Sequence, residues 1–438
     1  MTDRTPDLLP RPPTTGAMPR QAATLLLAAA FVVFSQSLFA AAPSADLRAL
    51  WLAGQMLAEG RPDLVYPAEI GVFTMRPPPE WLPWLAARGH SGEVFPYIYP
   101  PLWAWLAARS GLPFEALESA ARLINPMLLV AMLLLARRLA APAMHPAGYL
   151  APGLAVFALT TVGSVALHQN QPQILVAFLT VLAVERAEHG APRLAGAALA
   201  LAAAIKLYPA FFALVFLILG WRRALGAFVI TGGALAALSV AVAGWPLHGE
   251  FLSVLARISD TAMLTKLNYA LESALGIFLY PGSVQTVLAA ELGADADAGG
   301  GGWLVLAKPA ALAFGLRLAQ VAGLVWMLWL FRRARSRLER AALWPFGFIL
   351  MSMLGPIAWS YHYLAPVAFA PMLLARLGLE KGLAALALFT LVLSPFVLGA
   401  LPLETLDDTG QARLIQILGI TALAGLGLGF LALRRHGG

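Results

Sequence analysis

The chain has 438 residues, of which 60% are hydrophobic and only 12% are charged. Its mean hydropathy is +0.74, and several stretches approach the ~20 apolar residues that a transmembrane helix needs, so the sequence predicts an all-α polytopic membrane protein. The absence of cysteine excludes a disulfide framework and thiolate chemistry. The net charge of +7 does not indicate nucleic-acid binding, because Arg and Lys lie mostly in short loops, as in membrane proteins.

The N-terminal part of the chain predicts a tail, one span and a large loop. We expect residues 1–20 to form a disordered cytoplasmic tail and the apolar run 21–42 to cross the membrane outward. A first extracytoplasmic loop follows, at about 43–114. Its spacing of apolar residues predicts an amphipathic helix near 44–59. A second helix, at 99–108, is too short to span, and we expect it to dip into the membrane rim behind two prolines.

The rest of the chain predicts further spans and a second large loop. The spans are 115–136, 147–167, 172–187, 193–207, 208–220, 224–244, 303–331, 342–358, 363–378, 382–401 and 412–433. A second external loop covers about 245–302, and residues 434–438 form a short cytoplasmic tail. Every turn assigned to the cytoplasm carries at least two basic residues. The sequence thus predicts one transmembrane domain, 21–433, with about twelve spans and both termini in the cytoplasm.

Asp46 is the candidate general base. It lies where the first span ends, and it is the acidic residue of the first loop closest to a span end. A carboxylate at the membrane rim is well placed to take a proton from a hydroxyl of a substrate that reacts with a lipid-borne group. The simpler interpretation is a first-turn acid behind a Ser44 cap, favoured by the helix dipole.

Lys206 is the candidate binding site for a phosphate. It ends an Ala- and Leu-rich helix, where a charge at membrane depth costs about 2.5–3.5 kcal/mol on insertion scales. Such residues usually face an interior or a ligand, and a lipid phosphate is a natural counter-ion. The alternative is a lysine that extends to the outer surface. Pro209, three residues later, is expected to open the backbone nearby.

Two further polar clusters stand at predicted outer span ends. His168, Gln169 and Asn170 are followed by another glutamine, and together they offer the donors and acceptors that sugar hydroxyls require. A polar helix cap is the alternative. His362 lies in the turn between two predicted spans, where it either pairs with a phosphate or belongs to an interfacial aromatic belt. Arg257 and Lys266 are further external cations, each of which is individually explained as a surface charge.

The sequence carries no sign of a metal or nucleotide site. It has no phosphate-binding loop, no HExxH motif and no cysteine cluster. The one external DxD pattern, Asp295 and Asp297, lies in a low-complexity stretch rich in glycine and alanine. We therefore expect neither a bound metal nor another cofactor.

At these residues the chain resembles the polytopic glycosyltransferases of family 87. The matching pieces are the Asp46 segment, Tyr99-Pro100-Pro101-Leu102, Gln169-Asn170, the helix ending in Lys206 and Pro209, and Gly355-Pro356-Ile357-Ala358-Trp359 leading to His362. They follow the family's order over about residues 44–365. Two positions depart from the family pattern: His168 replaces a glycine before Gln-Asn, and Tyr361 replaces the first histidine of a Trp-x-His-His turn.

The resemblance implies a GT-C architecture and a mannosyltransferase-like activity in the cell inner (plasma) membrane. A hexose, here mannose, would move with inversion from a polyprenyl-phosphate-sugar donor to a glycolipid or glycan acceptor on the extracytoplasmic face. Asp46 would be the base. The expected donor-phosphate ligands are Lys206, His362, Arg257 and Lys266, and the expected sugar or acceptor ligands are His168, Gln169, Asn170, Tyr99, Tyr208 and Trp359.

The alternative class is a lipid or glycolipid transporter, or flippase, without transferase activity. A transporter typically shows paired repeats with helices interrupted near the midplane, whereas the polar clusters here lie at outer span ends. A non-catalytic membrane scaffold also fits the composition, but it has no need of Lys206 beside Pro209. The discriminating geometry is convergence: an enzyme requires Asp46, Lys206 and His362 to meet at one external cavity.

Overall fold

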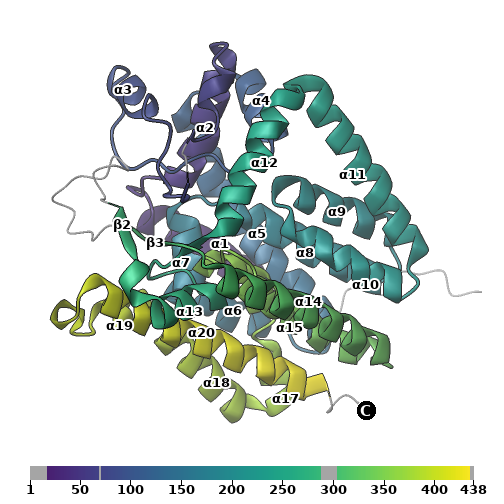
Figure 1. Ribbon diagram of the computed structural model, residues 1–438. Helices are drawn as coiled ribbons and strands as arrows, with labels where there is room; N and C mark the ends of the chain where they lie inside the picture. The colour runs from purple at the N-terminus through teal and green to yellow at the C-terminus, as the bar shows by residue number, and fades with distance from the viewer. Residues whose placement is uncertain (1–16, 69–70, 288–302, 435–438) are drawn as a thin grey trace, which may run out of the picture.

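The computed structural model describes residues 17–68, 71–287 and 303–434, and within them the chain is almost entirely helical (Figure 1). Helix α1, Ala17–Leu38, begins a turn before the predicted first span. Most of the predicted N-terminal tail and C-terminal tail, together with Asp295 and Asp297, lies outside the described residues.

Five helices of the described residues are long and apolar enough to cross a membrane. They are α1, α5 (Phe114–Ala140), α11 (Arg222–Ala243), α14 (Ala310–Arg333) and α20 (Asp408–Leu433). A sixth span results if α6 (Pro146–Leu159) and α7 (Thr161–His168), which are bent by 69° at their junction, are one broken span. The multi-pass, all-helical class is therefore confirmed, but the count of about twelve spans is not.

The other predicted spans are shorter or divided. Helices α8 (Gln173–Glu188), α9 (Pro192–Ile205) and α15 (Arg337–Met353) are single but short. The stretch predicted as 208–220 is a 3₁₀ helix, Tyr208–Phe212, followed by α10, Ala213–Ile218. The stretch predicted as 363–378 is divided into α16 (Leu364–Val367) and α17 (Met372–Leu377), and the predicted turn before it is the 3₁₀ helix Ser360–Tyr363. The stretch predicted as 382–401 is α18 (Leu379–Val392) with α19 (Pro395–Gly399). Prolines stand at several of these breaks, where they cannot donate the next helical hydrogen bond.

The second predicted loop contains regular structure, and the span predicted at 303–331 is wrong at its start. Helices α12 (Trp245–Asp260) and α13 (Leu271–Leu279) are joined by a small antiparallel sheet of order β1-β3-β2. Its strands are β1 (Thr261–Met263), β2 (Gln285–Val287) and β3 (Trp303–Ala307), with Ala262 opposite Leu306 and Thr286 opposite Leu304. The apolar run of β3 cannot be distinguished from the start of a helix by its pattern alone.

Both helices predicted in the first loop are confirmed. They are α2 (Ala45–Ala58) and α4 (Pro101–Ser110), with the short α3 (Trp81–Ala86) between them. Figure 1 shows α2 beside α4, and they approach so closely that a Cβ on Gly54 of α2 would lie 2.7 Å from the Cβ of Ala107. The amphipathic α2 is therefore fixed by packing at the edge of the bundle.

Helices α9 and α11 make the other close approach, at Gly196. A Cβ at this position would lie 2.1 Å from the carbonyl oxygen of Ala224 and 2.7 Å from the backbone nitrogen of Phe228. Small residues allow two membrane helices to pack backbone against backbone. Because α9 ends at Lys206, this contact also fixes the position of the candidate phosphate ligand.

Replacing Gly196 with alanine should separate α9 from α11 and destabilise the protein. Overpacking at a close contact typically costs about 1–3 kcal/mol, which thermal unfolding in detergent would detect as a lower midpoint. The matched control is Gly226→Ala on α11, where an added Cβ meets nothing within 4 Å and helix propensity favours alanine. Equal midpoints for the two variants would contradict this account of the packing.

Candidate active site

The first turn of α2 is held by the turn between α7 and α8. The backbone N–H of Ala45 donates to Oε1 of Gln169 at 2.9 Å, and Nδ2 of Asn170 donates to the hydroxyl of Ser44 at 2.9 Å. Asn125 of α5 donates in turn to Asn170 Oδ1 at 3.0 Å. Asp46 does lie in the first turn of α2 behind Ser44 at the N-cap position, as the simpler interpretation expects, but the Ser44 side chain makes no cap hydrogen bond. The acceptor for the first helical N–H comes instead from Gln169 in a distant turn, which fixes where α2 begins.

This attachment places Asp46 on the wall of a cavity of about 600 Å³. Four separate parts of the chain form the cavity: the first loop, the α9–α10 junction, α12, and the end of α15 with the turn that follows it. Most of the lining is apolar. Its members with a nitrogen or oxygen atom in the side chain are Asp46, Tyr99, Lys206, Tyr208, Ser352, Trp359, Tyr361 and His362.

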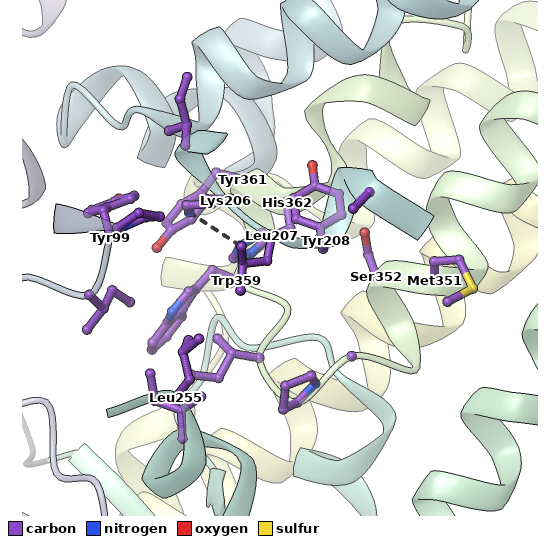
Figure 2. Close-up of a pocket in the computed structure, with 18 of the residues that line it drawn as sticks. Tyr99, Lys206, Leu207, Tyr208, Leu255, Met351, Ser352, Trp359, Tyr361 and His362 are labelled. Carbon is purple, nitrogen blue, oxygen red and sulfur yellow. Dashed lines mark hydrogen bonds between the residues drawn. The ribbon is translucent and has the colours of Figure 1, made fainter. Parts of the chain in front are cut away.

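Lys206 and His362 lie in contact within the cavity. Lys206 Nζ is 3.4 Å from His362 Nε2, as the dashed line in Figure 2 shows. The ring centroids of Tyr99 and Tyr361 lie 5.4 Å and 5.2 Å from the same nitrogen. In the described part of the chain, no carboxylate lies within 4.0 Å of Lys206 to form a salt bridge. The ammonium group is therefore surrounded by aromatic rings and remains available to an anion.

The local backbone explains how Lys206 reaches this position. Helix α9 ends at Ile205, and Lys206 is extended, with φ −135° and ψ 133°. Pro209 then stands near the start of the 3₁₀ helix Tyr208–Phe212. Because the chain leaves the helical path here, Lys206 projects into the cavity and not along the helix surface. The expectation that Lys206 extends to the outer surface is not met.

The electrostatics of Asp46 suit a proton acceptor at neutral pH. The pKa of its carboxyl is raised from 3.8 to about 7, chiefly by burial and to a smaller extent by the negative charge of Glu93, while Gln171 acts to lower it. The positive charge of Lys206 also acts to lower it. A general base is most effective when its pKa lies near the working pH.

His362 is neutral in this environment. Burial, with the nearby charge of Lys206, lowers the pKa of its imidazole well below the usual value. Its Nδ1 atom is buried without a hydrogen-bond partner among the described residues. His362 can therefore offer a hydrogen bond to a ligand, but it does not supply the positive charge that the sequence suggested.

Five of the predicted ligands do not line the cavity. Arg257 donates to the carbonyl of Pro67 at 2.7 Å, and Lys266 donates to Gln411 Oε1 at 2.6 Å. The ring of His168 packs edge-on against Phe39, with 6.3 Å between the ring centroids. Gln169 and Asn170 use their side chains to hold α2, as described above. Six do line it, namely Asp46, Lys206, His362, Tyr99, Tyr208 and Trp359.

Three residues near the site were not among the predicted ligands. Tyr361 lines the cavity beside Lys206, and Glu93 acts on Asp46 through its charge. Gln171 is fully buried and accepts a hydrogen bond from the Tyr99 hydroxyl at 2.8 Å. Gln171 could have been identified from the sequence, because it is the last of the four polar residues that begin at His168. Nothing in the sequence singled out Glu93.

No group of three or more His, Asp or Glu side chains in residues 17–68, 71–287 and 303–434 is arranged to hold a metal ion. The residues that the cavity offers are one carboxylate, one ammonium group, one imidazole and several hydroxyls. Such a set can remove a proton and bind an anion of low charge.

The fold and the site define a multi-pass helical membrane protein with a carboxylate and an ammonium group in one largely apolar cavity. Comparison with known families makes this specific. The chain belongs to glycosyltransferase family 87, whose model matches residues 97–356. It is therefore a glycosyltransferase, and the resemblance inferred from the motifs is confirmed. The matched region contains Lys206 and stops short of Asp46 and His362. No curated protein matches the chain.

Replacing Lys206 with methionine should raise the pKa of Asp46 above about 7, because a positive charge that lowers it is removed. Asp46 would then be protonated up to a higher pH. The protonated carboxyl of Asp46 gives a carboxylic-acid infrared band, which is identified because Asp46→Asn lacks it. The midpoint is the pH at which half of this band has disappeared in wild type or in the variant. Arg257→Met is the matched control, since Arg257 lies outside the cavity lining. An equal shift in both variants would contradict a specific interaction.

Proposed function

We propose that the protein transfers a hexose, mannose in the first instance, from a polyprenyl-phosphate-sugar donor to a glycolipid or glycan acceptor. The observation that carries this proposal is that Asp46, Lys206 and His362 line one largely apolar cavity. A lipid-phosphate donor needs an apolar wall and a cation together. The transferase class itself follows from the family to which the chain belongs.

The donor phosphate is proposed to bind Lys206, with His362 and Tyr208 as hydrogen-bonding neighbours. Lys206 has the charge, and its contacts are aromatic rings and a neutral imidazole. Arg257 and Lys266 are left out of this proposal because they are paired elsewhere. The prenyl chain is proposed to lie along the apolar lining, formed by Phe211, Leu214, Leu255, Ile258, Met351 and Ile357.

Asp46 is proposed to act as general base. The acceptor oxygen attacks the anomeric carbon and its proton passes to the carboxylate of Asp46. The bond between the anomeric carbon and the phosphate oxygen breaks on the opposite side, so the configuration inverts and polyprenyl phosphate leaves. The positive charge of Lys206 meets the negative charge that develops on the phosphate. The proton and the electron pair are both accounted for without a cofactor.

The orientation in the membrane is part of the same proposal. We propose that both termini lie in the cytoplasm and that the cavity opens on the extracytoplasmic side of the plasma membrane; the basic residues in short turns support this orientation. About twelve transmembrane passages are proposed, in which the short and divided helices complete spans that length alone does not identify.

A second candidate function, a lipid transporter or flippase, draws support from the bend of 69° between α6 and α7, because interrupted helices are common in transporters. The experiment that separates the two is transfer of a labelled sugar from a panel of polyprenyl-phosphate donors to membrane acceptors, with purified protein in liposomes. A labelled acceptor supports the transferase. Movement of the donor lipid between leaflets without any labelled product would favour the flippase.

Asp46→Asn should reduce turnover by about 10²–10⁴-fold, because the amide keeps the size of the side chain and removes its basicity. Steady-state transfer of labelled sugar, on protein shown to be folded by its thermal midpoint, provides the measurement. Glu59→Gln in the same loop is the control, since Glu59 hydrogen-bonds Trp84 outside the cavity lining, and it should stay near wild-type activity. Wild-type turnover in Asp46→Asn would contradict the assignment.

Activity should survive removal of divalent metals. A monophosphate leaving group can be stabilised by fixed cations, and Lys206 supplies a fixed cation in the cavity. Transfer measured in EDTA should match transfer in magnesium, and Lys206→Met should be the variant that loses activity. Loss of activity in EDTA that magnesium or manganese restores would show that the phosphate is held differently.

A further inference from the structure

Gln171 is held in one orientation beside the cavity. Its Oε1 atom accepts hydrogen bonds from the hydroxyl of Tyr99 at 2.8 Å and from the backbone N–H of Gln173 at 3.3 Å. A side-chain carbonyl oxygen has two lone pairs, and both are used here. Turning the amide over would face its N–H groups toward the backbone N–H of Gln173, which can only donate, and would require the Tyr99 hydroxyl, which donates here, to accept instead. The Nε2 end of Gln171 therefore has a fixed direction.

That nitrogen is a buried donor without a hydrogen-bond partner among the described residues. The side chain is 0% exposed, and a buried donor is unfavourable unless it has a partner. Gln171 is close enough to interact with two cavity groups, the carboxyl of Asp46 and the hydroxyl of Tyr361. Gln171 itself does not line the cavity, so it can influence a substrate only through Asp46 and Tyr361.

We propose that Gln171 is a positioning residue for the base: its Nε2, which has no partner in the described part of the chain, donates to the carboxylate of Asp46 when that group is ionised, and Tyr99 helps to keep the amide in the orientation that this bond requires. The inference rests on the proposed function, in which Asp46 removes the acceptor proton. The proposal also explains why Tyr99 is buried here. Its ring lies next to Lys206, and its hydroxyl binds Gln171, which in turn supports Asp46. Tyr99 is thus linked to both the cation and the proposed base.

The sign of the expected effect follows from the bond. A donor to the charged form of an acid lowers its pKa, so removing the amide should raise the pKa of Asp46. Because the reaction needs the carboxylate, the acidic limb of the pH–rate profile should move to higher pH. The strength of a hydrogen bond to a charged group corresponds to about one to two pH units.

The experiment compares Gln171→Met, Tyr99→Phe and the double variant with wild type. Gln171→Met should move the acidic limb upward by about one to two pH units and lower turnover at neutral pH, while the KM for the donor changes less than about twofold. Tyr99→Phe keeps the ring against Lys206 and frees the amide to turn, so it should shift the limb in the same direction by less. In the double variant, Tyr99→Phe should add nothing, because Tyr99 acts through Gln171.

Gln416→Met is the matched control. Gln416 of α20 is another fully buried glutamine, and its Nε2 donates to the carbonyl of Thr265 at 2.9 Å, away from the cavity lining. It should lower stability without moving the pH profile. The infrared midpoint of Asp46 gives the same information without turnover, so a variant with weak activity still yields a result.

The outcomes separate this inference from the proposed function. An acidic limb and an infrared midpoint that stay at the wild-type pH in folded Gln171→Met would overturn the positioning role, even if Asp46→Asn is inactive. Additive shifts from Tyr99→Phe and Gln171→Met would overturn the part assigned to Tyr99. Full turnover in Asp46→Asn would instead remove the proposed function, whatever Gln171 does.

Discussion

The attachment of α2 to the turn between α7 and α8 is the constraint on which the site depends. Two side chains of that turn, Gln169 and Asn170, hold the backbone and side chain of the residues just before Asp46. Ser44 and Asn170 both have positive φ angles, 49° and 45°, which non-glycine residues rarely adopt. Such backbone is kept only where the surroundings determine it. The position of Asp46 is therefore set by the bundle and not by its own loop.

A second constraint is the low polarity of the cavity. Burying a carboxyl and an ammonium group among apolar side chains is unfavourable for each ion taken singly. The interaction between Asp46 and Lys206 opposes this cost, since each favours the charged form of the other. The aromatic rings of Tyr99 and Tyr361 also face Lys206. The same apolar wall that makes the charges costly is what a lipid-borne substrate would require.

The sequence predicted the positions of Asp46, Lys206 and His362 at one cavity because each lies at the end of an apolar stretch, where a charge or imidazole is conspicuous. It could not predict which polar residues face the cavity and which face the protein. Gln169 and Gln171 are two residues apart in one polar run, yet Gln169 accepts from Ala45 of α2 and Gln171 accepts from Tyr99, partners that lie far away in the sequence. The sheet was missed because β3 reads as the start of an apolar span. The hydrogen bonds of Arg257 to Pro67 and of Lys266 to Gln411 also depend on distant partners.

Within the residues that the structure describes, no carboxylate forms a salt bridge with Lys206, and this has a consequence for product release. A sugar phosphodiester carries a single negative charge, whereas the phosphate monoester left after transfer carries about −1.5 to −2 at pH 7. With Lys206 as the phosphate ligand, as proposed, the spent monoester is attracted more strongly than the fresh diester. For a polyprenyl-phosphate donor, release of the spent lipid is then the step we expect to limit turnover, with the spent lipid acting as an inhibitor as it accumulates in the bilayer.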